Sequence, residues 1–349
     1  ARRCVGFRRS AERRNEVDAA KRRGTPSRGE ADSSRTEVRF AIAFPTIWGT
    51  ATLLADLLRQ PVSFGLLACL PCDRKINLGV RRTTESATSL NKPLDYIFPN
   101  PPEGLDPRQL DPARVPQHVA VIMDGNGRWA KKRALNRLRG HKAGIEAVRE
   151  TIRCASDVGV RYLTIYSFST ENWKRPEDEV VGLMDLFAKT MLAEVDGLHE
   201  EHVRVRTIGD LSALPEATRA AFDEAWEKTR DNTGMTLAVA VNYGSRQEIL
   251  HAVEGCVRRA LLEEAEGRDP LAAVSEEAFA RGLYTTGMPD PDLVIRTSGE
   301  MRISNFLLWQ IAYSEFYCTD VLWPDFDRYE FLRALLDYQG RDRRFGAVK

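Results

Sequence analysis

The sequence lacks the patterns that mark several common classes of binding protein. Its 349 residues contain neither the dinucleotide-binding pattern G-x-G-x-x-G nor the phosphate-loop pattern G-x-x-x-x-G-K-[ST]. Its six cysteines are scattered, and the one C-x-x-C, from Cys69 to Cys72, has no second pair to complete a zinc site. The formal net charge is only +1, so composition gives no reason to expect a nucleic acid partner. Any basic binding site must therefore be local.

Long apolar runs are also missing. The apolar stretch from Phe40 to Leu70 is interrupted by prolines and charged side chains, and it never reaches the ~20 residues that a membrane-spanning helix needs. It is preceded by an Arg-rich start and followed by a stretch rich in Arg, Ser, Thr and Pro. We interpret residues 1–106 as a disordered targeting leader and linker, and residues 107–349 as one folded domain.

From Val115 onward, apolar strand-like runs alternate with longer amphipathic segments, which is typical of an α/β domain. The predicted strands are residues 119–123, 162–168, 203–208, 237–241, 293–295 and 321–323. The predicted helices are residues 142–158, 177–199, 215–232, 246–266 and 326–338. We therefore expect a single α/β domain with a largely parallel central sheet of about six strands, flanked by helices.

The most informative segment runs from His118 to Gly144 and reads HVAVIMDGNGRWAKKRALNRLRGHKAG. Val119 to Met123 is a continuous apolar run, typical of a strand buried on both faces. The strand ends at Asp124, and Gly125 to Gly127 supply a tight turn whose backbone N–H groups can face a phosphate. A basic helix follows, so one carboxylate lies among many cations, as a site for Mg²⁺ and pyrophosphate requires. The alternative is an ordinary strand-to-helix turn followed by a solvated helix face.

Polar residues follow each of the first five predicted strands. Ligands of such sheets bind beyond the carboxyl ends of the strands, so these side chains form a candidate site. Loops are usually polar in any case, which leaves a purely structural interpretation open. The residues are Asp124, then Ser167, Ser169, Glu171 and Asn172, then Gly209 and Asp210, then Asn242, Tyr243 and Gly244, and finally Arg296, Thr297 and Ser298.

Five segments resemble the signatures of the cis-prenyltransferases, the undecaprenyl and dehydrodolichyl diphosphate synthase family, in that family's order. They read M-D-G-N-G-R-W-A with G-H-K-A-G, then Y-S-F-S-T-E-N-W-K-R-P, I-G-D, N-Y-G-S-R, and D-L-V-I-R-T-S-G-E-M-R-I-S-N-F-L-L-W-Q-I-A-Y-S-E-F-Y with W-P-D-F. The resemblance covers roughly Val115 to Gly346. It implies a transferase that condenses isopentenyl diphosphate with an allylic prenyl diphosphate, forms a Z-polyprenyl diphosphate and releases pyrophosphate. Residues 107–349 would be its catalytic domain.

The same resemblance implies roles for individual residues. Asp124 would hold Mg²⁺ against the allylic diphosphate, with Glu315 as a second carboxylate for the metal. Asn126, Ser169 and Asn172 would lie near the reacting carbons, Asn126 helping to remove the proton. Substrate binding would fall to Gly125, Gly127, Arg128, Trp129, Arg137, His141, Trp173, Arg175, Arg296, Arg302 and Ser304. Taken alone, His141 reads as a surface histidine at a helix start and Arg302 as a surface cation.

The resemblance also implies partners and a location. The tail motif R-x-G, Arg344 to Gly346, reaches the neighbouring subunit's site in this family, which implies a homodimer. We expect peripheral membrane association through the apolar product, whose slot Leu183, Leu186, Phe187 and Leu237 would line. A plant organellar member is the expected source type, and the leader is expected to direct the protein to a plastid, the chloroplast. The endoplasmic reticulum membrane surface and the cytoplasm are the alternatives.

One departure and one alternative stand beside this interpretation. Met301 occupies a position where many bacterial members carry histidine, so any role of that side chain is absent. No Asp-Asp pair occurs, which excludes the aspartate-rich motif of the trans-type synthases. The alternative function is a non-catalytic subunit that activates a partner cis-prenyltransferase. That alternative predicts loss of Asp124, Asn172, Arg296 and Arg302, all of which are present.

Overall fold

A six-stranded sheet organises residues 90–342, the part of the chain that the computed structural model describes. The strands are β1 (His118–Ile122), β2 (Tyr162–Ser169), β3 (Arg204–Ile208), β4 (Thr236–Tyr243), β5 (Leu293–Arg296) and β6 (Glu315–Cys318). Their order is β3-β4-β2-β1-β5-β6, and every neighbouring pair is parallel. The expected parallel α/β sheet is confirmed, and all carboxyl ends of the strands lie at one edge.

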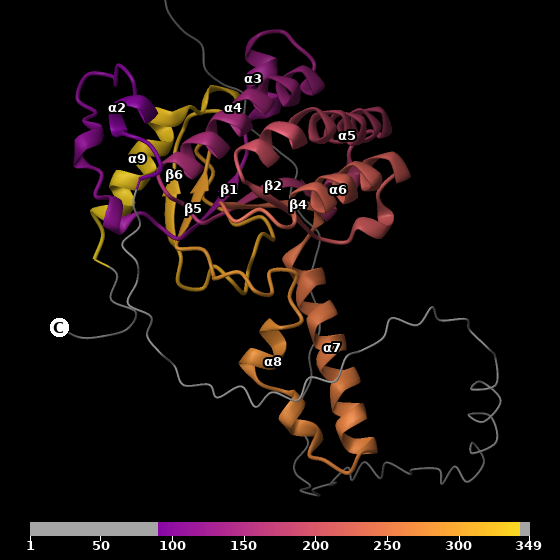
Figure 1. The fold of residues 1–349 in the computed structure, drawn as a ribbon. Coiled ribbons are helices and arrows are strands. Elements are labelled where there is room, and N and C mark those ends of the chain that lie inside the picture. The colour runs from indigo at the N-terminus through magenta and orange to yellow at the C-terminus, as the bar shows by residue number, and fades with distance from the viewer. Residues whose placement is uncertain (1–89, 343–349) are drawn as a thin grey trace, which may run out of the picture. The chain divides into compact units, whose positions relative to one another are not determined.

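Helices connect the strands, as parallel pairing requires. They are α2 (Leu94–Ile97), α3 (Asn126–Lys132), α4 (Arg137–Asp157), α5 (Glu177–Glu200), α6 (Glu216–Thr229), α7 (Ser245–Ala265), α8 (Glu276–Ala280) and α9 (Arg328–Gln339). In Figure 1, α4, α5 and α6 lie along one side of the sheet, while α7 and α8 extend away from it as an arm. None of the helices in residues 90–342 is both long and apolar enough to cross a membrane.

Alternation along β1 divides the core into two layers. Val119 and Val121 face the larger cluster, which the helices cover, while Ala120 and Ile122 face a smaller cluster that contains Phe306. All five residues of β1 are buried. Because both faces of the central strand are covered, its sequence is continuously apolar rather than alternating.

The sixth predicted strand is wrong. Val321 and Leu322 lie in a loop, Trp323 begins a short 3₁₀ helix (Trp323–Asp325), and the sixth strand is β6, Glu315–Cys318. The apolar run at this point reflects the burial of Trp323 beneath α4, not a strand. There the indole N–H of Trp323 donates to the carbonyl of Gly144 at 3.0 Å. β6 lies at the edge of the sheet and alternates between half-buried and exposed residues, so it has no apolar run to reveal it.

The predicted boundary between the linker, residues 1–106, and the folded domain also lies too late in the sequence. Ile97 and Phe98 are 2% and 1% exposed and belong to the main core. Their backbone is fixed by α9, since Arg328 Nη1 donates to the carbonyl of Ile97 at 2.9 Å and Tyr329 donates to Pro99. Residues 90–106 therefore belong to the folded domain, whereas the proposed leader lies outside the described residues.

Candidate active site

The carboxylate of Asp124 lies two residues beyond β1, at the carboxyl edge of the sheet. The backbone N–H of Asp124 donates to Thr297 Oγ1 at 2.9 Å, and the Thr297 hydroxyl donates to the Asp124 carbonyl at 2.6 Å. Gly125 follows with φ of +110°, a conformation that favours glycine, and its N–H donates to Asp124 Oδ1 at 2.7 Å. The turn and the end of β5 thus hold the carboxylate against the sheet edge.

Arg296, the last residue of β5, is the main partner of this carboxylate. Its Nη2 donates to Asp124 Oδ2 at 3.0 Å, and its Nη1 donates to Ser304 Oγ at 2.9 Å and to the Arg302 carbonyl. The guanidinium is nearly buried, with a side-chain exposure of 5%. Its Nε is buried without a hydrogen-bond partner among the described residues. The guanidinium of Arg296 is therefore already oriented by the protein before an anion binds to it.

Glu300 joins two more of the predicted arginines, a role that the sequence did not indicate. It accepts from Arg128 Nη2 at 2.9 Å and also pairs with Arg302. Arg128 further donates to the Ser298 carbonyl at 2.9 Å and lies 3.5 Å from Asp124 Oδ2. One loop therefore brings Arg128 and Arg302 to the same side of Asp124. An acid within a largely polar loop carries no sequence signal for such a role.

A second pair of arginines is held by Glu179 at the start of α5. Arg175 Nη1 lies 3.1 Å from Glu179 Oε1, and Arg137 Nη1 lies 3.6 Å from the same oxygen. Burial and the charge of nearby Arg137 lower the pKa of Arg175 below its usual range. Glu179 was also missed by sequence reasoning, because an acid in the first turn of a helix is ordinary.

His141 faces the same cluster of cations. Burial, followed by the charges of Arg175 and Arg137, lowers its pKa to about 4, so the imidazole is neutral at pH 7. Its Nε2 is buried and has no hydrogen-bond partner among residues 90–342, and the same holds for Asn126 Oδ1. Buried polar atoms without partners are rare in folded proteins, and they are expected where a ligand supplies the missing contact.

Two glycines of α4 allow Asn126 to lie close against the backbone of that helix. A Cβ on Gly140 would lie 2.1 Å from the Asn126 carbonyl oxygen, and a Cβ on Gly144 would lie 2.6 Å from Asn126 Oδ1. Gly127 has a similar function, since a Cβ there would lie 2.8 Å from Nε of Arg137. Any side chain at these positions would displace the predicted site residues.

The end of β2 supplies Ser169 and Asn172 in a reciprocal cap. Ser169 N–H donates to Asn172 Oδ1 at 3.2 Å, and the Ser169 side chain accepts from the backbone of Asn172. Ser169 and Asn172 therefore cap the short helix and also belong to the candidate site. Trp173 is half-buried and does not line the cavity described below; its indole N–H donates to Asn242 Oδ1 at 2.7 Å, and its ring packs edge-on against Phe168.

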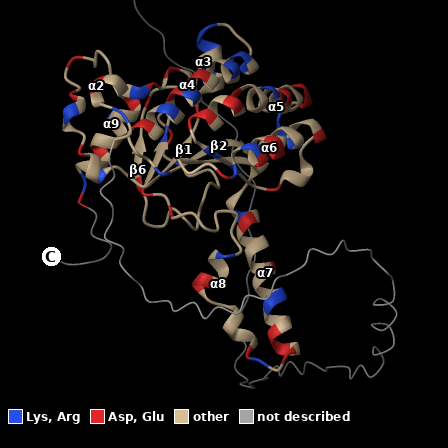
Figure 2. Cartoon of the chain, in the orientation of Figure 1, with Lys and Arg blue, Asp and Glu red and all other residues tan. Residues whose placement is uncertain are grey.

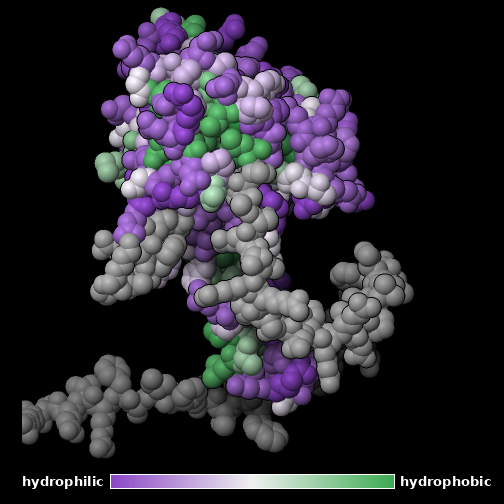
Figure 3. Space-filling view, turned by 60° about the vertical axis from the view of Figure 1, so that its left-hand side comes forward, coloured by the Kyte–Doolittle hydropathy of each residue, from purple (hydrophilic) through white to green (hydrophobic). Residues whose placement is uncertain are grey.

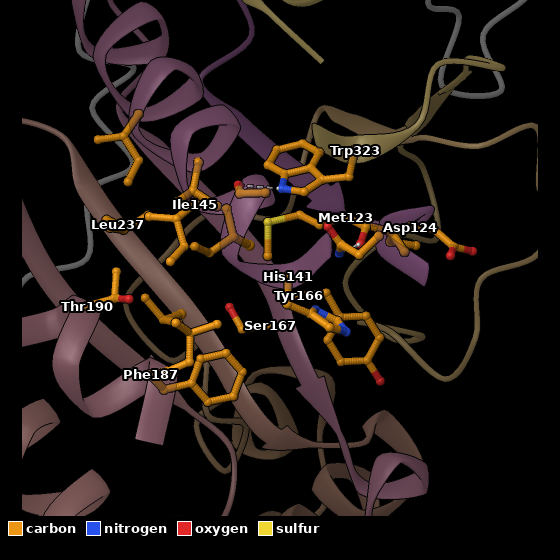
Figure 4. A pocket seen from close by; sticks show the side chains of 18 of the residues that line it. Met123, Asp124, His141, Ile145, Tyr166, Ser167, Phe187, Thr190, Leu237 and Trp323 are labelled. Atoms are coloured by element: carbon orange, nitrogen blue, oxygen red, sulfur yellow. Dashed lines mark hydrogen bonds between the residues drawn. The ribbon is translucent and has the colours of Figure 1, made fainter. Parts of the chain in front are cut away.

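These residues open onto a cavity of about 690 Å³ between α4, α5 and the sheet. Figure 4 shows Asp124 at one end of the cavity and Phe187, Thr190 and Leu237 at the other. Its walls away from Asp124 are largely apolar and include Ile145, Val148, Ile152, Leu186, Phe187, Met191, Leu198, Leu237 and Val239. The predicted slot residue Leu183 is instead 1% exposed within the core. A polar mouth thus leads into an apolar chamber of the size that small ligands occupy.

Nine of the predicted site residues line this one cavity: Asp124, Asn126, His141, Ser169, Asn172, Arg175, Arg296, Arg302 and Ser304. Arg128 and Arg137 join them through Asp124, Glu300 and Glu179. Gly125 contributes its backbone N–H to Asp124, and Gly127 leaves room for Arg137. The structure does not bring Trp129 there, because its indole N–H donates to Asp325 at 2.7 Å and Arg133 stacks on its ring.

Glu315 is likewise not at this site. It begins β6 and is paired in register with Leu293 at the start of β5, so it lies at the amino edge of the sheet. There it accepts from Arg341 Nη1 at 2.8 Å. The two predicted metal ligands are therefore on opposite edges of the sheet within one chain.

The mouth of the cavity fits a diphosphate-bound Mg²⁺. Asp124 presents a half-exposed carboxylate surrounded by arginines, and proteins commonly bind Mg²⁺ through one or two carboxylates together with substrate phosphates. Within residues 90–342, no group of three or more His, Cys, Asp or Glu side chains forms a metal cage by itself. Asp124 would thus hold the ion only together with diphosphate oxygens.

The comparisons agree with this geometry. Residues 122–346 match the family model described as "Putative undecaprenyl diphosphate synthase". The chain is 49% identical over 256 residues to an isoprenyl transferase of Clostridium perfringens, covering 73% of this chain and all of that protein. It is 53% identical over 234 residues to an isoprenyl transferase of Agrobacterium fabrum, covering 67% and 93% of the two chains.

Two solved structures share the fold. Lavandulyl diphosphate synthase from Lavandula x intermedia, in complex with dimethylallyl diphosphate, is 36% identical with a TM-score of 0.62, covering 67% of this chain and 99% of that one. A probable undecaprenyl diphosphate synthase from Campylobacter jejuni is 30% identical with a TM-score of 0.54, covering 66% and 99%. The chain is thus a prenyltransferase of the α/β type. It belongs to the undecaprenyl diphosphate synthase family, the cis-prenyltransferases.

Proposed function

We propose that this enzyme condenses isopentenyl diphosphate with an allylic prenyl diphosphate and forms a Z-polyprenyl diphosphate. The allylic carbon–oxygen bond breaks, pyrophosphate leaves, a carbon–carbon bond forms to isopentenyl diphosphate, and that substrate loses a proton. The observation that carries the proposal is one cavity that has Asp124 and Arg296 at its mouth and largely apolar walls beyond them. Such a cavity suits a diphosphate joined to a hydrocarbon chain.

The arginines and their neighbours are proposed to serve two diphosphates. Arg128, Arg137, His141 and the turn around Gly125 are proposed to hold the allylic diphosphate, whose charge increases as the carbon–oxygen bond breaks. Arg296, Arg302 and Ser304 are proposed to hold isopentenyl diphosphate. Mg²⁺, bound through Asp124, would supply further stabilisation of the leaving diphosphate when present.

The remaining residues near Asp124 are proposed to orient the carbons and remove the proton. Asn126 follows closely after Asp124, and its buried Oδ1, which has no partner among residues 90–342, could accept a hydrogen bond from substrate. Ser169 and Asn172 are held by their mutual cap and therefore face the cavity with little freedom. The apolar walls would keep water from the allylic cation.

A homodimer is proposed as the functional form. On the arm, exposed apolar side chains recur at helical spacing along α7, at Leu250, Val253, Val257 and Leu261, with exposures of 64%, 43%, 53% and 61%. Figure 3 shows hydrophobic side chains on this lower part of the molecule. A second copy would cover such a stripe. The R-x-G tail, predicted to reach the partner's site, lies outside the described residues.

The decisive experiment is a condensation assay with radiolabelled isopentenyl diphosphate, an allylic primer and Mg²⁺. We expect labelled product that partitions into organic solvent, and mass spectrometry of that product gives its chain length. Chelation of Mg²⁺ should abolish the reaction. No product from the purified protein alone, together with stimulation of a catalytic partner, would support the non-catalytic subunit instead.

The cellular location is proposed to be a plastid, since the leader combines an Arg-rich start with a Ser-, Thr- and Pro-rich connection. A tagged full-length protein should co-localise with a chloroplast marker. Signal confined to the cytoplasm or to the endoplasmic reticulum would contradict this assignment. It would leave the condensation reaction unaffected.

A further inference from the structure

A basic and apolar surface lies on the turn between α3 and α4. Residues 131–139 are nine consecutive exposed residues that read KKRALNRLR, with five cations, two leucines and no acid. Figure 2 shows Lys and Arg gathered on α3 and the turn after it. We define the α3–α4 patch as Lys131, Lys132, Arg133, Leu135, Leu138 and Arg139. The site described above uses none of them.

The positive charge of the patch is only partly neutralised. Arg133 lies 3.5 Å from Asp325 and stacks on Trp129 at 3.9 Å. Lys131, Lys132 and Arg139 form no ion pair with any residue between 90 and 342. Three cations, two at the end of α3 and one in the first turn of α4, therefore have no counter-charge from the described part of the chain. This concentration of charge contrasts with the formal net charge of only +1 for the whole chain.

The two leucines add apolar area between these cations. Leu135 is 44% exposed and Leu138 is 36% exposed. Leu138 extends over Gly182 of α5, where a Cβ would lie 3.0 Å from its Cδ2, and the neighbouring Val181 is 58% exposed. Apolar side chains surrounded by lysine and arginine are typical of segments that lie in a membrane interface.

The patch also adjoins the mouth of the cavity. Arg137, the first residue of α4, pairs with Glu179, and Glu179 also pairs with the cavity residue Arg175. A surface that accepts anionic headgroups here would bring the cavity mouth close to lipid. The patch has no free aromatic platform for stacking bases, since Trp129 is already covered by Arg133. Lipid therefore suits it better than a nucleic acid.

We propose that the α3–α4 patch docks the protein onto an anionic lipid surface, with Lys131, Lys132 and Arg139 at the headgroups and Leu135 and Leu138 in the interface. The cations would be attracted to the negative surface potential and the leucines would enter the boundary of the acyl chains. The inference goes beyond the condensation reaction and does not depend on it.

The test is co-sedimentation of the full chain, without substrates, with phosphatidylcholine vesicles and with vesicles of phosphatidylcholine and phosphatidylglycerol at 3:1. We expect binding to the anionic vesicles only, weakened by raising the salt concentration. The triple variant Lys131→Gln/Lys132→Gln/Arg139→Gln should lose at least tenfold in affinity, and Leu135→Ser should lose several-fold. The matched control Lys189→Gln/Lys228→Gln/Arg230→Gln removes three exposed cations from α5 and the region of α6 and should bind like the wild type.

The variants should keep their condensation rate with a soluble short primer in detergent, which separates docking from catalysis. If the triple variant is misfolded by circular dichroism, Lys131→Arg/Lys132→Arg must bind as wild type and the single Arg139→Gln must still weaken binding. Equal losses in the control and patch variants would overturn the proposal. Preferential binding to an oligonucleotide, with no binding to anionic vesicles, would assign the patch to nucleic acid instead.

Discussion

Arg296 at the end of β5 donates a hydrogen bond to Asp124 beyond the end of β1, with 3.0 Å between Nη2 and Oδ2. The two residues are 172 positions apart in the sequence, and the adjacent parallel strands β1 and β5 bring them together. The pair places one nearly buried cation against the one carboxylate proposed to hold Mg²⁺. It therefore joins the two proposed diphosphate sites, because each partner belongs to a different one.

Replacing Asp124 with asparagine tests this carboxylate. The amide keeps the size of the side chain but removes the counter-charge of the nearly buried Arg296, so the protein should still fold, with a lower melting temperature. The loss of a metal-bound carboxylate should lower kcat/KM about 10²-fold or more, as expected when several kcal/mol of charge stabilisation are removed. The control is Asp196→Asn, an exposed acid on α5 that pairs with Lys228. Steady-state kinetics that give equal values for both variants would contradict the role of Asp124.

Arg302→Lys and Arg128→Lys form a matched pair, because both arginines pair with Glu300. Lysine keeps the charge but loses the planar fork that suits diphosphate oxygens. We expect Arg302→Lys to raise the KM for isopentenyl diphosphate roughly tenfold with a smaller effect on the allylic substrate. Arg128→Lys should give the reverse pattern. Equal changes in both KM values for either variant would show that its arginine is assigned to the wrong diphosphate.

Truncation tests where the domain begins. Removal of residues 1–89 should leave the rate and the Mg²⁺ requirement unchanged, because no residue proposed for the site is lost. Removal of residues 1–100 also takes away Ile97 and Phe98, each worth ~1.5–3 kcal/mol of burial. That variant should melt roughly 10 °C lower in a thermal unfolding experiment, since about 1 kcal/mol corresponds to ~2–4 °C at this size. Equal melting temperatures would show that Ile97 and Phe98 add little to the core.

Stability should fall in mild acid because of His118. Burial lowers its pKa to about 4, although the Pro289 carbonyl accepts a hydrogen bond that opposes this effect. The unfolded state therefore takes up a proton first as the pH falls, so stability is complete above about pH 6.5 and decreases toward pH 4. His118 alone accounts for about 3 kcal/mol of this loss. Urea unfolding at pH 7.5 and 4.5 should show a smaller difference for His118→Gln.

The sequence predicted the parts of the fold that have a continuous or periodic apolar pattern. β1, β2 and β4 are buried on both sides and were found because of it. β6 was missed because an edge strand is only half-buried, and the apolar run at 321–323 misled because a buried loop near Trp323 looks like a strand. Ile97 and Phe98 were missed because a short helix among prolines resembles a linker.

The candidate site was predicted less evenly. Asp124 and Arg296 come from strand ends, whose common edge follows from parallel pairing, so their meeting could be expected. Glu300 and Glu179 organise four of the arginines, yet each lies in a polar stretch without a pattern. Glu315 was misplaced because its position depends on where β6 begins. The shape of the cavity depends on how α4 and α5 lie on the sheet, which local sequence does not specify.

Gly140 and Gly144 have a consequence for engineering this enzyme. Both positions look like neutral helix interior, where alanine normally increases helix stability by about 1 kcal/mol. Here the added methyl group would fall 2.1 Å from the Asn126 carbonyl or 2.6 Å from its Oδ1. A campaign that stabilises the protein by replacing helical glycines would therefore inactivate it at these two positions. Gly255 has open space around it and does not line the cavity, so it is the safe choice, whereas the open space beside Gly197 is the cavity itself.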